Sequence, residues 1–94
     1  MSPESKANAL ELVKARLNRL DTLLDDYLTA RIEAAVIDLE KTGIILTDSV
    51  GDLMLVVDYV CWAYQNRDAT AGMPDWLRLR RRERWLQQRR EESE

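Results

Sequence analysis

Residues 50–64 read VGDLMLVVDYVCWAY, and this stretch decides the fold. Twelve of its fifteen residues are apolar. At about 100° per residue they surround nearly the whole circumference of a helix. A helix that is apolar on almost every side must be covered by other elements. We therefore predict a core helix over about residues 48–67, beginning at Thr47 or Asp48.

Two side chains inside this stretch carry possible chemistry. Asp58 is a carboxylate in apolar surroundings, which is costly unless it is paired, so we expect an arginine partner rather than a catalytic role. Cys61 is most simply a small buried hydrophobe.

Helical spacing and capping residues predict three further helices around the core helix. The first begins at Ser5 and runs to about Asn18. The second covers about residues 23–42 and ends at Gly43, the residue type that most often adopts a left-handed C-cap. This second helix has two apolar faces, which calls for two packing partners. The last covers about residues 74–92, with Pro74 at its favoured first position.

The expected architecture is therefore all-α, a small bundle of about four helices in one domain over residues 1–94. Residues 1–6 and 91–94 are expected to be disordered. With 46% hydrophobic residues in only 94, the chain has more apolar material than a small solvated bundle needs. Oligomerisation would bury this surplus apolar surface.

Charge is segregated along the chain. The segment 76–90, WLRLRRRERWLQQRR, holds seven arginines and one acid, a net charge of +6, whereas the whole chain is −3. The rest of the chain therefore carries −9. Arginine presents a planar fork of donors that suits carboxylates, phosphates and aromatic faces. A charge split of this kind favours a partner-binding surface over a solvated helix face.

A helical wheel divides the arginine-rich helix into two sides. Trp76, Leu79 and Leu86 form a narrow apolar stripe, which we expect to dock on the core. Trp85 then points away from the core. It is surrounded by guanidinium groups three, four or seven residues away, those of Arg78, Arg81, Arg82 and Arg89. Because Trp and Arg are the residue types most enriched in binding hot spots, we predict a contact surface centred on Trp85.

The sequence offers little for catalysis. It has no histidine and one cysteine, which excludes a Ser–His or Cys–His pair, a disulfide within the chain and the common zinc sites. It contains no glycine-rich phosphate-binding motif. No enzyme activity, cofactor or metal is expected. Neither a signal-peptide core nor a membrane-spanning stretch is apparent, so no membrane partner is expected.

Four runs of the sequence resemble the phage head–tail connector (head-completion adaptor) proteins of long-tailed phages. They are ELVKARLNRL (11–20), DDYLTARIEAAVIDLE (25–40), DSVGDLMLVVDYVCWAYQNRD (48–68) and GMPDWLRLRRRERWL (72–86). The resemblance covers roughly residues 7–86. It rests on packing and docking patterns, and the family has no catalytic signature.

The resemblance implies a structural adaptor that assembles as a homo-oligomeric ring under the portal at the head–tail junction. The ring would extend the DNA channel, through which DNA passes without specific binding, and give a platform for a downstream connector or tail-completion protein. The protein would act in virion assembly and DNA packaging, assembled in the host cytoplasm and located in the virion. The family also implies roles for two groups of residues. The residues that would contact the portal or a neighbouring subunit are Arg78, Arg81, Arg82, Trp85 and Arg89. Those that would pack between subunits are Tyr27, Ala34 and Ile37.

Two other functions are open to a chain of this composition. A small helical nucleic-acid-binding module would place the arginine-rich helix on phosphates, although a pI near 5.0 and the −9 elsewhere oppose it. A regulatory protein that buries its core helix in a complex with one obligate partner is a weaker third hypothesis.

Overall fold

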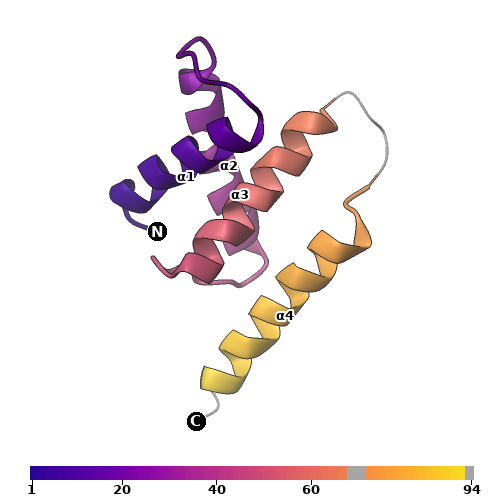
Figure 1. Ribbon diagram of the computed structural model, residues 1–94. Helices are drawn as coiled ribbons and strands as arrows, with labels where there is room; N and C mark the ends of the chain where they lie inside the picture. The colour runs from indigo at the N-terminus through magenta and orange to yellow at the C-terminus, as the bar shows by residue number, and fades with distance from the viewer. Residues whose placement is uncertain (68–71, 93–94) are drawn as a thin grey trace.

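The computed structural model describes residues 1–67 and 72–92, and it contains four helices (Figure 1). They are α1 (Pro3–Arg16), α2 (Asp25–Lys41), α3 (Val50–Gln65) and α4 (Asp75–Glu92), and the described residues form no strand. The predicted all-α fold is therefore confirmed, with an apolar third helix and an arginine-rich last helix. Residues 68–71 lie outside the described part, and so do residues 93–94 of the C-terminal end that was expected to be disordered.

The first helix begins earlier than the sequence suggested. Ser2, rather than Ser5, is the N-cap of α1, and its side chain accepts a hydrogen bond from the backbone N–H of Ser5. Asp48 accepts hydrogen bonds from the Ser2 N–H and the Ser5 hydroxyl, at 2.8 and 2.9 Å. The expected disorder of residues 1–6 is therefore wrong, because these contacts hold the N-terminus against the segment before α3.

The turn after α2 has the predicted glycine geometry. Gly43 has φ +98, a left-handed conformation that residues with a side chain rarely adopt. The chain then runs through residues 44–46, whose Ile44 and Leu46 are buried in the core. Ser49 is the N-cap of α3, one or two residues after the predicted start, and its hydroxyl accepts the Asp52 N–H.

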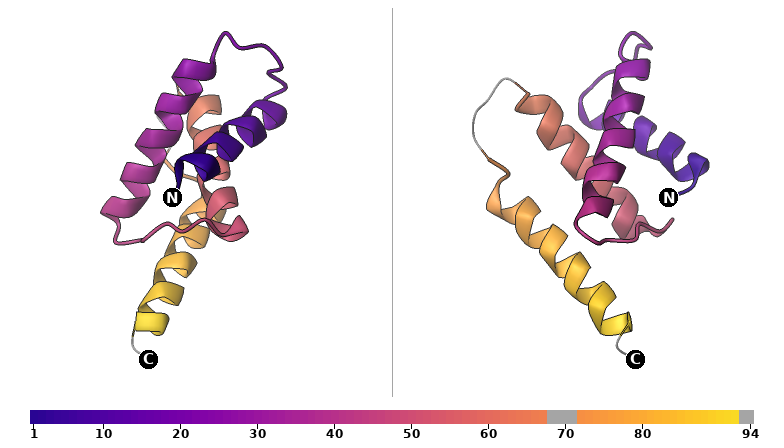
Figure 2. Two further views of the ribbon diagram at one scale, coloured as in Figure 1. Left: turned by 90° about the vertical axis from the view of Figure 1, so that its left-hand side faces the viewer. Right: turned by 180° about the vertical axis from the view of Figure 1, so that it is seen from behind.

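The core lies where α1, α2 and α3 meet. α2 and α3 contribute five buried apolar residues each; those of α3 are Leu55, Val56, Val57, Val60 and Cys61. α4 runs antiparallel to α3 on the side away from α1 (Figure 2). In the described part of the chain, no helix is both long and apolar enough to cross a membrane.

Candidate protein-binding surfaces on the arginine-rich helix

α4 is attached to the rest of the molecule mainly by polar side chains. Its fully buried apolar residue is Leu77, and its other buried residue is Gln88. The partly buried Trp85 also packs against the core, and polar contacts add to these two residues in fixing the orientation of the helix. These come from two carboxylates of α3, Asp52 and Asp58, and from the segment that joins α2 to α3.

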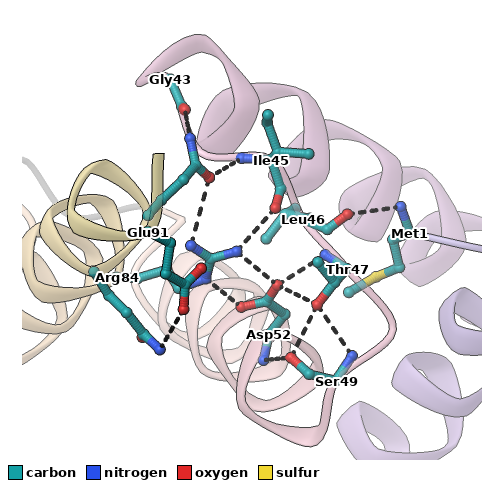
Figure 3. A network of polar contacts seen from close by, with 11 residues as sticks. Met1, Gly43, Ile45, Leu46, Thr47, Ser49, Asp52, Arg84 and Glu91 are labelled. Carbon is teal, nitrogen blue, oxygen red and sulfur yellow. Dashed lines mark hydrogen bonds and ion pairs between the residues drawn. The ribbon is translucent and has the colours of Figure 1, made fainter. Parts of the chain in front are cut away.

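Asp52 accepts hydrogen bonds from both α4 and its own helix start. Arg84 Nε lies 2.7 Å from Asp52 Oδ1, and Arg84 Nη2 donates to the Ile45 carbonyl at 2.9 Å (Figure 3). The backbone N–H and the hydroxyl of Thr47 both donate to Asp52 Oδ2 at 2.8 Å. Burial by itself would raise the pKa of Asp52. The hydrogen bonds from Arg84 and Thr47 outweigh burial, so the pKa lies below its ordinary value.

Gln88 completes the attachment one helical turn further along α4. Its side-chain Oε1 accepts the Ile45 N–H and its Nε2 donates to the Gly43 carbonyl, both at 2.7 Å. These two bonds satisfy backbone groups of a segment that belongs to no helix. Such groups are costly to bury unpaired, so the amide fixes both α4 and the turn after α2.

Asp58 joins three helices through a single carboxylate. Its two oxygens accept from Arg16 of α1 and Arg80 of α4, and its side chain is nearly buried. The predicted arginine partner of Asp58 is therefore confirmed, and there are two of them. The Arg16 and Arg80 side chains are 43% and 39% exposed, so both ion pairs are partly open to solvent.

The predicted orientation of α4 is wrong. Trp76, Leu79 and Leu86, expected to dock on the core, are 47%, 56% and 38% exposed. Trp85, expected to point outward, is partly buried and packs against the core. The physical reason is that Asp52 and Asp58 require Arg84 and Arg80. These two arginines share a face of α4 with Leu77 and Gln88, so that face turns inward.

The arginines predicted to surround Trp85 nevertheless come together. Arg78, Arg81, Arg82 and Trp85 line a cavity of about 390 Å³ with Thr42, between α4 and the C-terminal end of α2. The fifth predicted residue, Arg89, places its guanidinium 5.1 Å from the centre of the Trp85 ring. We call this cavity the arginine groove. It is a concave surface with three cationic forks and one indole, rather than a convex outward face.

The seven arginines of residues 76–90 are not equivalent. Arg84 pairs with Asp52, Arg80 shares Asp58 with Arg16, and Arg78 pairs with the exposed Asp75 in the same helix. Of the other four, Arg81 and Arg82 line the arginine groove, and Arg89 lies over the Trp85 ring. Chemically, the groove can bind carboxylates or phosphates through bidentate hydrogen bonds.

The three residues expected to pack between subunits lie on α2 but differ in exposure. Ala34 and Ile37 are exposed. Tyr27 is partly buried, and its ring contacts Tyr64 and the Arg31 guanidinium within the same chain. Tyr27 is therefore already used for internal packing, whereas Ala34 and Ile37 remain accessible to a neighbour.

Sequence reasoning missed three residues that position these surfaces: Asp52, Arg84 and Gln88. A usable signal was present. Asp52 and Asp58 are the only two acids in an otherwise apolar helix, and Arg80 and Arg84 are one turn apart on the only strongly basic helix. Buried carboxylates must be paired, and Arg80 and Arg84 lie on one face of α4. That combination would have indicated which side of α4 turns inward.

The described residues give no sign of a metal centre, since no three Cys, Asp or Glu side chains among them gather as ligands would. Comparison of the chain with protein-family models, with curated proteins and with solved structures found no match.

Proposed function

We propose that this chain is a structural adaptor that assembles as a ring under the portal at a phage head–tail junction. The ring would extend the DNA channel and give a platform for tail attachment. The observation that carries the proposal is the arginine groove, a cationic cavity on a firmly attached helix of an otherwise acidic protein. The groove would bind an acidic surface of the portal.

The composition of the groove favours a protein partner. Arginine and tryptophan are the residue types most enriched in interface hot spots. Trp85 is already held in place by the core, so little side-chain freedom is lost on binding. The ion pairs of Arg84 with Asp52 and of Arg80 with Asp58 likewise fix the helix before a partner arrives. A preorganised surface of this kind suits a permanent assembly.

The placement at the head–tail junction rests on the resemblance of residues 7–86 to the connector proteins of long-tailed phages. The segregation of charge supports it, because a basic helix and an acidic body allow one surface of a subunit to meet a different surface of another molecule.

A nucleic-acid-binding function has less support. Three of the seven arginines already have carboxylate partners within the chain. The charge of −9 outside residues 76–90 would repel phosphates. DNA in the channel would thus pass without specific binding.

Binding to the portal encoded in the same genome tests the proposal. Wild-type protein should co-sediment with purified portal rings and add a ring of density to them in negative-stain images. Arg81→Glu with Arg82→Glu should weaken binding at least tenfold, because two groove cations become anions. Lys41→Glu with Arg67→Glu is the control, since it changes the net charge equally at exposed positions outside the groove.

Two results would overturn the proposal. One is wild-type protein that fails to bind the portal even at high concentration. The other is a groove variant that binds as tightly as the control. A titration with duplex DNA runs in parallel, and tight binding that is lost steeply with added salt would favour the nucleic-acid alternative.

A further inference from the structure

α4 packs against fewer elements than the other three helices do. α1, α2 and α3 each pack against the other two, whereas α4 packs mainly against α3 and against the segment of residues 43–46 (Figure 2). The fully buried apolar residue of α4 is Leu77, and the partly buried Trp85 adds to it. α2 and α3 bury five apolar residues each. The three-helix body of α1, α2 and α3 therefore has a core of its own, to which α4 adds little.

Polar contacts make up the rest of the attachment of α4. Arg84 pairs with Asp52 of α3, and a second ion pair joins Arg80 to Asp58. Gln88 binds two backbone groups of the turn after α2. We call these five residues the docking residues of α4. When such contacts break, water replaces the lost hydrogen bonds and the charges regain their hydration. Separating α4 from α3 is therefore less costly than the number of contacts suggests.

Both buried carboxylates of α3 keep partners when α4 leaves. Asp58 remains paired with Arg16 of α1. Asp52 still accepts two hydrogen bonds from Thr47, and its side toward α4 becomes accessible to water. These contacts lie within the three-helix body and the segment before α3. The body can therefore stay folded while α4 is detached, as in the local openings that native proteins undergo.

The arginine groove exists only while α4 is docked. One wall of the groove is Thr42, the C-cap of α2. Its other lining residues, Arg78, Arg81, Arg82 and Trp85, all lie on α4. Separation of the two helices removes one wall of the cavity and takes the indole away from the core. The docking residues and the groove are therefore coupled, although the two sets share no residue.

We propose that α4 opens and closes as one unit while the three-helix body stays folded, and that this motion dismantles and assembles the arginine groove. The closed state is dominant, and the open state is a minor population. The inference rests on the proposed function of the groove and identifies its regulation. A partner that binds the groove selects the closed state. A change that makes the open state dominant lowers the apparent affinity in proportion to the closed fraction that is left.

Native-state hydrogen exchange of the full chain, measured by NMR at several low denaturant concentrations, tests the opening. Amides at the centre of α4, residues 80–86, should be protected about tenfold less, or weaker still, than the most protected amides of α2 and α3. Their exchange should also depend less on denaturant, because opening exposes less surface than unfolding does. Equal protection and equal denaturant dependence in α3 and α4 would overturn the inference. Protection that declines steadily toward residue 92 would show fraying instead and would overturn it too.

Two variants separate the opening of α4 from unfolding of the whole chain. Ile32→Val removes one methyl group from the core where α2 packs on α1. It should lower the protection of the α2 and α3 core amides about two- to tenfold and leave that of α4 unchanged. Gln88→Ala should lower the protection of α4 and of the core by the same factor, about fivefold, because it weakens the one state in which α4 is docked.

Either variant can contradict the inference. If α4 loses protection in step with the core in Ile32→Val, α4 opens only when the whole chain unfolds. If Gln88→Ala leaves the protection of α4 at the wild-type value, the docking residues do not hold the helix.

Portal binding separates this inference from the proposed function. Excess portal should slow exchange at residues 80–86, because binding to the closed state depletes the open state. If the portal binds and this exchange is unchanged, the coupling of the docking residues to the groove is wrong and the adaptor function stands. If α4 opens as a unit but the protein ignores the portal at any concentration, the adaptor function is wrong and the opening of α4 stands.

Discussion

Arg84 of α4 and Asp52 of α3 form an ion pair in which the Nε to Oδ1 distance is 2.7 Å and the carboxylate side chain is only 3% exposed. This pair, together with the bond from Arg84 to the Ile45 carbonyl, fixes which side of α4 faces the molecule. The position of the arginine groove and the exposure of Trp76, Leu79 and Leu86 follow from it.

Removing the arginine should destabilise the protein strongly. Arg84→Ala leaves Asp52 buried with its main charge partner lost, which typically costs about 3–5 kcal/mol. Chemical denaturation followed by circular dichroism measures the change in the free energy of unfolding. Asp52→Asn combined with Arg84→Ala should recover part of the loss, because no buried charge is then left unpaired. A loss below about 1 kcal/mol in Arg84→Ala would contradict this account of how α4 is attached.

Stability should fall in acid. The pKa values of Asp52 and Asp48 are both below their ordinary range in the folded protein; for Asp48 the main cause is the hydrogen bond from the Ser2 backbone N–H. A lowered folded-state pKa stabilises the protein fully above the unfolded value, about 3.9, and this contribution is lost as pH falls through the folded value. The denaturation midpoint should therefore be nearly flat at neutral pH and drop below about pH 5.

Asp52→Asn is the variant that checks the acid dependence. It should be less stable than wild type at pH 7, and its midpoint should fall less steeply between pH 5 and pH 3. Glu11→Gln, which removes an exposed carboxylate, should keep the wild-type slope. An equally steep fall in Asp52→Asn would show that this carboxylate is not a source of the pH dependence.

Two glycines provide a matched pair of substitutions. A Cβ at Gly43 would lie 3.0 Å from Trp85 Nε1, and its φ of +98 is unfavourable for any side chain. Gly43→Ala should cost about 1–2 kcal/mol and shift the fluorescence of Trp85. Gly51 lies in the first turn of α3 with open space around it, so Gly51→Ala should stabilise the protein by about 0.5–1 kcal/mol. If Gly43→Ala and Gly51→Ala changed the free energy of unfolding equally, this would contradict the close packing of Trp85 against the turn at Gly43.

Leucine truncations along α4 report its orientation directly. Leu77 is fully buried, so Leu77→Ala should cost about 2–5 kcal/mol of unfolding free energy. Leu79→Ala and Leu86→Ala should each change the stability of the monomer by less than about 0.5 kcal/mol. Chemical denaturation at low protein concentration, where the protein is monomeric, measures these three changes in the free energy of unfolding. If Leu79→Ala and Leu86→Ala were more destabilising than Leu77→Ala, the side of α4 that carries Leu79 and Leu86 would face the core, as first expected from the sequence.

Local sequence signals were enough to predict the helices. Pro74 indicates the start of the last helix and Gly43 the end of the second, because the backbone preferences of proline and glycine act within one or two residues. The apolar circumference of α3 indicated burial without any knowledge of its neighbours. The N-terminal cap was misplaced: Ser2, and not Ser5, caps α1. Both serines are also bound by Asp48, more than forty residues away in sequence, a contact that local signals do not reveal.

The sequence by itself determined that this protein is a set of four helices around an apolar core helix, with its positive charge gathered on the last one. It also determined that arginines surround Trp85, since spacing along one helix fixes which side chains are neighbours. Only the tertiary structure decided which side of that helix faces inward. The amphipathic pattern favoured Trp76, Leu79 and Leu86, but the buried carboxylates Asp52 and Asp58 required cations, and leaving them unpaired would cost more than exposing two leucines and a tryptophan.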